Sequence, residues 1–190
     1  MNNSTLGVRQ GAAMPEVVYY VAASLDGYIA TPDGGVEWLD PFQSGSEDYG
    51  YSAFYDSVDA VLLGSRTYVQ SLGFGEWPYP DKPCWVFSGS INSSVPDGVT
   101  VTDRSPREVV SELSERDVTR AWLVGGGSLA ASFRDAGLIT ELIVSIMPVI
   151  LGGGVPLFAV PGPRTRLHLT DSTVYGDGVT QLVYRPADDA

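Results

Sequence analysis

Short apolar runs separated by turn residues recur along the chain. The runs at 16–23, 60–63, 84–88 and 120–124 are rich in β-branched and aromatic residues and have the length of buried strands. A longer apolar run covers 142–149. Strands that are apolar on both sides are typical of a sheet covered on both faces. A shorter strand is predicted at 99–101.

Helix signals lie between these runs. Ser105 is a candidate N-cap, Pro106 suits the first helical position, and Glu108 completes a capping box, so we predict a helix to about 115. Ser46 is a candidate N-cap for another helix over 46–55, with acids in its first turn. Two further helices are expected directly after Gly64 and after 125–127, the second ending near 137.

The order of these elements predicts the fold class. Two final strands, 167–175 and 179–185, are joined by Gly176-Asp177-Gly178 as a hairpin. Strands alternating with helices predict a three-layer α/β fold whose central mixed sheet is mostly parallel, with an antiparallel C-terminal hairpin. Ligands of such sheets bind beyond the carboxyl ends of the strands.

The length of 190 residues, with 44% hydrophobic residues, fits one domain with a full core. We expect a flexible tail at 1–14, the domain at 15–187 and a short tail at 188–190. The polar start has no apolar core of a signal peptide, and no run reaches the ~18 apolar residues of a membrane helix. A cytoplasmic protein is expected.

Composition excludes several classes of function. The net charge of −12, from 11 bases and 23 acids, disfavours nucleic acids and anionic membranes as partners. Cys84 is the only cysteine and His168 the only histidine, so neither an intrachain disulfide nor a thiolate zinc site can form, and no metal site is expected.

The charges are also unevenly distributed. No base lies between Arg9 and Arg66, a stretch that holds nine acids. We therefore expect an anionic group of a ligand to bind the later part of the chain, because the early part would repel it.

The most informative motif is the triple glycine at 125–127, which follows a buried strand and opens a helix. Glycines let a ligand approach the backbone, and a helix N-terminus presents free N–H groups to an anion such as a pyrophosphate. The alternative is a tight turn, for which one glycine would suffice. Ser128-Leu129-Ala130 follows, so the motif lacks the last glycine of the GxGxxG fingerprint.

Gly64, Ser65, Arg66 and Thr67 repeat this design of strand, glycine and helix start. Thr67 could bond a phosphate and Arg66 could add charge. The alternative is a capped helix with a solvated arginine. Two such loops in one sheet favour a dinucleotide more strongly than either loop does alone.

Four segments together carry a resemblance to a known family. They are Ala22-Ala-Ser-Leu-Asp-Gly-Tyr-Ile-Ala30, Leu62-Leu-Gly-Ser-Arg-Thr-Tyr68, Val124-Gly-Gly-Gly127 and Met147-Pro-Val-Ile-Leu-Gly-Gly-Gly-Val-Pro-Leu-Phe158. In this order they resemble the dihydrofolate reductase-like family, in particular the reductase domain of bacterial riboflavin biosynthesis proteins. The resemblance covers about 16–186.

The resemblance implies an NADPH-dependent reductase that forms a homodimer through its late strands. It places Ala22 and Ala23 beside the nicotinamide, and Ser88 and Gly89 at the adenosine ribose. The residues that it implies for the phosphates and the pyrophosphate are Gly64, Ser65, Arg66, Thr67, Gly125, Gly126, Gly127, Ser128 and Leu129.

The chain departs from this family at two positions. Ser65 and Ser128 stand where arginines usually grip the 2′-phosphate of NADPH. Arg66 or Arg104 could replace them, and NADH remains possible as the cofactor.

Asp48 is the candidate catalytic residue. In dihydrofolate reductases a carboxylate lies on the helix before the first glycine loop, and Asp48 falls 16 residues before Gly64, a similar separation. It would orient a pteridine- or pyrimidine-like ring or relay a proton. The alternatives are an acid that serves only the helix dipole, and Glu47 in the same role.

Candidate substrate contacts are Asp26, Tyr51, Ser145 and Gly153. The predicted reaction is hydride transfer from NAD(P)H to a planar heterocycle, as in dihydrofolate reductase and 5-amino-6-(5-phosphoribosylamino)uracil reductase. Because 10–65 holds no base, we predict that the natural substrate is not that phosphoribosyl compound. A non-catalytic NADP(H)-binding module and a flavin-linked reductase are the alternatives.

Overall fold

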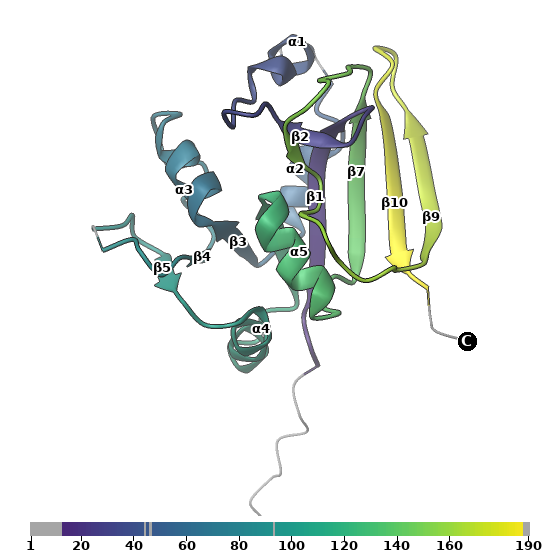
Figure 1. The fold of residues 1–190 in the computed structure, drawn as a ribbon. Helices are drawn as coiled ribbons and strands as arrows, with labels where there is room; N and C mark the ends of the chain where they lie inside the picture. Colours follow the sequence, from purple (N-terminus) through teal and green to yellow (C-terminus); the bar gives the residue numbers. More distant parts are fainter. Residues whose placement is uncertain (1–12, 44, 46, 93, 188–190) are drawn as a thin grey trace, which may run out of the picture.

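The computed structural model describes residues 13–43, 45, 47–92 and 94–187. Its core is one sheet with the strand order β5-β4-β3-β6-β1-β7-β10-β9 (Figure 1). The strands are β1 (Glu16–Ser24), β3 (Ala60–Gly64), β4 (Cys84–Phe87), β5 (Val99–Thr102), β6 (Arg120–Gly125), β7 (Glu141–Met147), β9 (Leu167–Val174) and β10 (Thr180–Pro186).

All neighbouring strands from β5 to β7 are parallel, and β10 is antiparallel to both β7 and β9. This confirms the predicted α/β class with its mixed, mostly parallel sheet and antiparallel C-terminal hairpin. The first strand, β1, lies inside the sheet, between β6 and β7.

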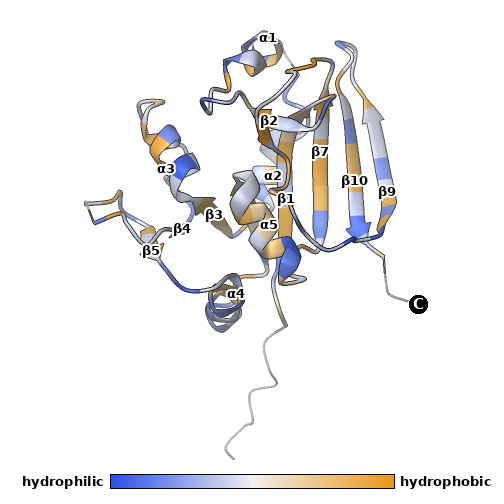
Figure 2. Cartoon of the chain, in the orientation of Figure 1, coloured by the Kyte–Doolittle hydropathy of each residue, from blue (hydrophilic) through white to orange (hydrophobic). Residues whose placement is uncertain are grey.

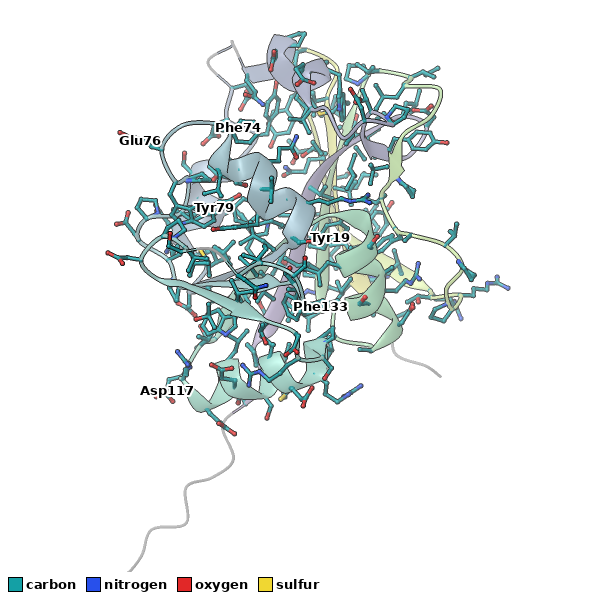
Figure 3. All side chains as sticks on the ribbon, turned by 60° about the vertical axis from the view of Figure 1, so that its left-hand side comes forward. Tyr19, Phe74, Glu76, Tyr79, Asp117 and Phe133 are labelled. Atoms are coloured by element: carbon teal, nitrogen blue, oxygen red, sulfur yellow. The ribbon has the colours of Figure 1, made fainter. Side chains whose placement is uncertain are left out.

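Helices cover both faces of the parallel part. On one face α4 (Pro106–Glu115) and α5 (Gly127–Asp135) bury Leu113 and Phe133 in one cluster with Tyr19 of β1; Tyr19 and Phe133 are labelled in Figure 3. On the other face α2 (Tyr51–Asp56) and α3 (Ser65–Leu72) bury Phe54 and Tyr68. The apolar strands between them are visible in Figure 2.

The C-terminal hairpin of β9 and β10 is more exposed to solvent than the rest of the sheet. Every residue of β9 is exposed, including the apolar side chains of Leu167, Leu169 and Val174. β9 therefore leaves a free edge at the end of the sheet.

The three longer helices begin in different ways. α4 has the predicted capping box: Ser105 Oγ accepts the N–H of Glu108, and the Glu108 carboxylate accepts the N–H of Ser105. In contrast, α3 begins after Gly64 and α5 after Gly126, and neither N-terminus has a side-chain cap. The first N–H groups of α3 and α5 are thus left for another partner.

The helix predicted over 46–55 begins only at Tyr51, and that prediction was wrong at its start. Gly50 is the N-cap, with a left-handed φ of 78°, so the backbone cannot continue as a helix through it. Asp48 precedes the helix in a turn, and Ser46 lies outside the described residues. β7 ends at Met147 rather than 149, before Pro148, which has no N–H for a ladder.

Four short elements were not predicted. β2 (Tyr28–Ala30) and β8 (Val155–Pro156) pair with each other, and η1 (Glu37–Leu39) and α1 (Asp40–Gln43) follow β2. β2 and β8 lie beyond the end of β1 (Figure 1). Among the described residues, no helix has the length and apolar character needed to cross a membrane.

Candidate functional site

Two glycine loops meet at the carboxyl ends of β3 and β6. These strands are adjacent and parallel, so Gly64 and Gly126 come together although they are far apart in sequence. A Cβ placed on Gly64 would lie 3.3 Å from the carbonyl oxygen of Gly125, and one on Gly126 would lie 3.7 Å from Thr67 Oγ1. The uncapped N-termini of α3 and α5 therefore open side by side, which favours binding of an anion.

The three glycines at 125–127 differ in whether the structure requires a glycine at that position. Gly125 has a φ of 118°, which disfavours other residues, and it is joined to Gly126 by a cis peptide bond. A Cβ on Gly127 would overlap the carbonyl oxygen of Pro156 in β8. Gly126 has neither constraint, because its φ is −82° and a Cβ would make only ordinary contacts. The fold requires Gly125 and Gly127, whereas Gly126 leaves room at the helix N-terminus.

The remaining predicted phosphate residues lie around this junction. Ser65 and Thr67 are half-buried in the first turn of α3, and Ser128 is exposed in the first turn of α5. Leu129 is buried in the core, so only its backbone can face a ligand. Arg66 is exposed, and within the described residues no hydrogen bond or ion pair engages its side chain.

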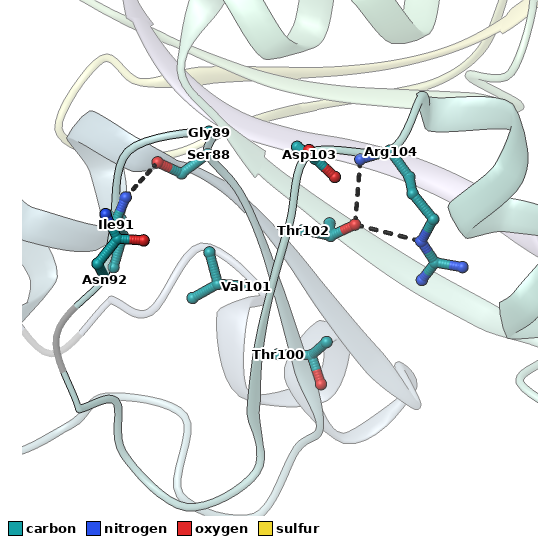
Figure 4. A pocket seen from close by; sticks show the side chains of 9 residues that line it. All are labelled: Ser88, Gly89, Ile91, Asn92, Thr100, Val101, Thr102, Asp103 and Arg104. Atoms are coloured by element: carbon teal, nitrogen blue, oxygen red, sulfur yellow. Dashed lines mark hydrogen bonds between the residues drawn. The ribbon is translucent and has the colours of Figure 1, made fainter.

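A cavity of about 400 Å³ lies at the carboxyl ends of β4 and β5 (Figure 4). Ser88 and Gly89 line it after β4, and Asp103 and Arg104 line it after β5. Ser88 Oγ accepts the N–H groups of Ser90 and Ile91, which fixes the turn after β4. Strand neighbours are about 4.8 Å apart, so the cavity lies next to the glycine loops on the side of β4.

On the other side, three residues form a row across β1, β7 and β10. Ala22 pairs in register with Ser145, and Ser145 pairs with Gln181. Gln181 Nε2 donates to Ser145 Oγ at 3.0 Å and to the carbonyl oxygen of Tyr49 at 2.9 Å. Ser145 is buried, as is Ala23, which faces the α4–α5 side. Gln181 was missed because nothing in the sequence pairs it with a residue 36 positions earlier.

Asp48 lies at this end of the sheet, three residues before α2 begins at Tyr51. Its carboxylate accepts the N–H groups of Gly50 at 2.9 Å and Ser52 at 3.2 Å. These hydrogen bonds hold the pKa of Asp48 below its usual value, so the group is ionised at neutral pH. Such a carboxylate is suited to accept hydrogen bonds from a ring and is a poor proton donor.

Tyr49, next to Asp48, anchors this segment to the hairpin. Its hydroxyl donates to Asp177 in the β9–β10 turn and its ring packs edge-on against Tyr175. Its carbonyl oxygen also accepts the hydroxyl of Tyr20. The acidic segment before α2 is therefore fixed to the end of the sheet by contacts that sequence patterns do not reveal.

Tyr51 belongs to a cluster of aromatic rings on the α2 face. Its ring lies 5.8 Å from that of Trp122 and 6.3 Å from that of Tyr20. Burial raises the pKa of the Tyr51 hydroxyl, although the side chain stays partly exposed. Tyr51 thus has both a packing role and a free surface at the site.

Asp26 organises the loop after β7. Its carboxylate accepts the hydroxyl of Ser24 at 2.7 Å and the N–H groups of Leu151 and Gly152 at 3.0 and 2.7 Å. The bond from Ser24 leads the contacts that lower the pKa of Asp26. Gly153 follows this anchor, and a Cβ there would meet nothing within 4 Å. Within the described residues, no group of three or more acids, histidines or cysteines is placed to hold a metal ion.

Comparison with known proteins gives a family match over most of the chain. The family model described as the RibD C-terminal domain matches residues 15–181. The uncharacterised protein YwjB of Bacillus subtilis is 39% identical over 170 residues, which cover 89% of this chain and 97% of YwjB. The riboflavin biosynthesis protein RibD of Mycobacterium tuberculosis is 28% identical, over 77% of this chain and 46% of RibD.

Solved structures agree with the fold. A Shewanella sp. PV-4 protein, whose name refers to riboflavin biosynthesis, superposes with a TM-score of 0.82 and 30% identity, covering 90% of this chain and 99% of that one. A deaminase/5-amino-6-(5-phosphoribosylamino)uracil reductase of Thermotoga maritima gives a TM-score of 0.71 at 18% identity, covering 92% of this chain and 57% of that one.

Proposed function

This chain belongs to the family of RibD C-terminal domains, and we propose that it is a reductase that transfers a hydride from NADPH, with NADH as the alternative donor, to a planar pteridine- or pyrimidine-like heterocycle. Relatives whose names state an activity include a 5-amino-6-(5-phosphoribosylamino)uracil reductase, which supports an oxidoreductase role. The observation that carries the proposal is the junction of the uncapped helices α3 and α5 around Gly126.

The residues at the junction fit a dinucleotide. Free N–H groups of both helices would hold the pyrophosphate, and Arg66 would add a positive charge beside them. The cavity after β4 and β5 would take the adenosine ribose through Ser88 and Gly89. When bound, the nicotinamide supplies the hydride, and the protein contributes binding, alignment and exclusion of water.

The heterocycle would bind near the row of Ala22, Ser145 and Gln181. Asp48, ionised and close to this end of the sheet, would accept hydrogen bonds from the ring and hold it in place. Tyr51 would offer a flat apolar surface, and Gly153 would leave room at the loop after β7.

The first experiment measures binding of NADPH, NADH and FMN by thermal stabilisation, since a ligand of the native state raises the Tm. We expect a shift with NADPH that Gly126→Val removes, because this side chain would fill the space at the two helix N-termini. Ser132→Val, on the exposed face of α5 beyond its first turn, is the matched control and should keep the shift. No shift with either nicotinamide dinucleotide would refute the proposal, and a shift with FMN alone would favour a flavin-linked reductase.

We also propose that the substrate carries no phosphate. The segment with Asp48 and the hairpin turn with Asp177 place acids at the substrate end of the site. Arg164 and Arg166 precede β9 and therefore lie at the opposite end of the sheet. Arg185 lies at that end as well and pairs with Glu141. Arg66 and Arg104 lie beside the expected cofactor instead.

This substrate proposal is tested by following NADPH oxidation with 5-amino-6-(5-phosphoribosylamino)uracil and with the same compound lacking its phosphate. We expect the phosphorylated form to be the poorer substrate, because acids near the site repel it. Efficient turnover of the phosphorylated form at low concentration would refute the proposal while leaving the reductase function in place.

A further inference from the structure

Among the described residues that line the cavity at the ends of β4 and β5, Arg104 is the only base. Thr102 Oγ1 accepts hydrogen bonds from the backbone N–H of Arg104 at 3.2 Å and from its Nε at 3.3 Å. Figure 4 shows the Arg104 side chain folded back beside Thr102, away from Ser88 and Asn92. The guanidinium is therefore held at one side of the cavity.

Glu112 of α4 forms an ion pair with the Arg104 guanidinium. Its Oε2 accepts a hydrogen bond from Arg104 Nη2, and its Oε1 lies 2.6 Å from Arg116 Nη2. The Glu112 side chain is only 15% exposed, whereas that of Arg104 is 42% exposed. A largely buried carboxylate thus restrains a cation that solvent, and a ligand in the cavity, can reach.

Glu112 keeps its negative charge between Arg104 and Arg116. Burial raises its pKa, but the hydrogen bond from Arg104 and the charges of Arg104 and Arg116 outweigh this effect, and the pKa lies below its usual value. Glu112 is therefore a carboxylate at neutral pH. A carboxylate and a phosphate compete for the same guanidinium N–H groups, because both accept them in similar geometry.

We propose that Arg104 is the residue that recognises a 2′-phosphate on the adenosine ribose, and that Glu112, by competing for Arg104, sets how strongly the protein prefers NADPH over NADH. This inference rests on the proposed function, which places the adenosine end of the dinucleotide in this cavity. A phosphate monoester carries a charge of about −1.5 to −2 at pH 7 and can draw Arg104 from the single carboxylate. NADH offers only a hydroxyl at the same position and leaves the ion pair intact.

The test compares dissociation constants for NADPH and NADH, measured by calorimetry on the full chain. Arg104→Gln should weaken NADPH binding about tenfold, the effect of losing one charged hydrogen bond, with NADH within about twofold. Glu112→Gln should strengthen NADPH binding by about three- to tenfold and leave NADH unchanged. The double variant should behave as Arg104→Gln alone.

Arg116→Gln is the control for Glu112, because it removes the other partner of the same carboxylate without freeing Arg104. It should not strengthen NADPH binding. The Tm of each variant without ligand verifies that it is folded.

Two results would overturn the inference while the proposed function stands. The first is an unchanged ratio of NADPH to NADH affinity in Arg104→Gln. The second is weaker NADPH binding in Glu112→Gln, which would mean that Glu112 orients Arg104 and does not compete with the ligand. Absence of binding of either dinucleotide to the unaltered protein would refute the proposed function itself, and the inference with it.

Discussion

Single residues at the site divide into those that the fold needs and those that it leaves available. Gly125 and Gly127 are needed, for backbone conformation and for contact with Pro156, whereas Gly126 is not. Asp26 holds the loop at 151–152 through its hydrogen bonds. In the sequence alone the three glycines look alike, and so do the acids. The contacts that give each one a different role come from segments far away in the chain.

At the scale of one residue, Asp48→Asn separates an enzyme from a binding module. If Asp48 orients the substrate, turnover should fall about 100-fold or more while the affinity for NADPH stays within about twofold. Because hydrogen bonds lower the pKa of Asp48, kcat should stay level through neutral pH and fall only in acid. Asp56→Asn, on an exposed position of α2, is the control. Equal turnover in both variants would exclude the role of Asp48.

Asp26→Asn should lower the Tm at pH 7, because the amide cannot accept the same three hydrogen bonds. The pKa of Asp26 is lowered in the folded state, so its contribution is present above the unfolded value near 4 and is lost as the pH falls through the folded pKa. Thermal melts from pH 7 to pH 3 should show the difference between the two proteins shrinking in acid. A difference independent of pH would contradict this reading.

Elements with local signals could be predicted from the sequence, and elements set by tertiary contacts could not. The capping box of α4 and the Gly-Asp-Gly hairpin turn are formed by residues close in sequence. The start of α2 depends on Gly50, and β2 and β8 are too short to show a period of two. The glycine loops were predicted, but the anchoring of Tyr49 by Asp177 and Gln181 was not.

Ion pairs link four neighbouring strands, β6, β1, β7 and β10, at the end of the sheet opposite the site. Glu141 of β7 accepts from Arg120 of β6 at 2.6 Å and from Arg185 of β10 at 2.9 Å. Glu141→Ala should lower the free energy of unfolding by about 2–3 kcal/mol, less than for a fully buried pair because Arg185 is half exposed. Urea denaturation measures this, with exposed Glu115→Ala expected within about 0.5 kcal/mol. A loss equal to that of the control would show that the pairs add no stability.

For the molecule as a whole, the free edge of β9 is the feature that bears on assembly. We propose that two copies associate through this hairpin, since Leu167, Leu169 and Val174 are exposed along it. Light scattering during size-exclusion chromatography should give about twice the mass of 20.3 kDa, and Leu169→Lys should shift the protein toward monomer. Val69→Lys, an exposed apolar position on α3, is the control. A monomer at all concentrations would refute the proposal.

The position of β1 inside the sheet has a consequence for how the chain is made. β1 leaves the ribosome well before its neighbours in the sheet, β6 and β7, which begin at Arg120 and Glu141. Arg185, the ion-pair partner of Glu16 in β1, is translated later still. Synthesis at about 5–20 residues per second leaves β1 without its sheet partners for several seconds or more. The nascent chain must therefore keep an apolar strand from other contacts until β6 and β7 have been translated.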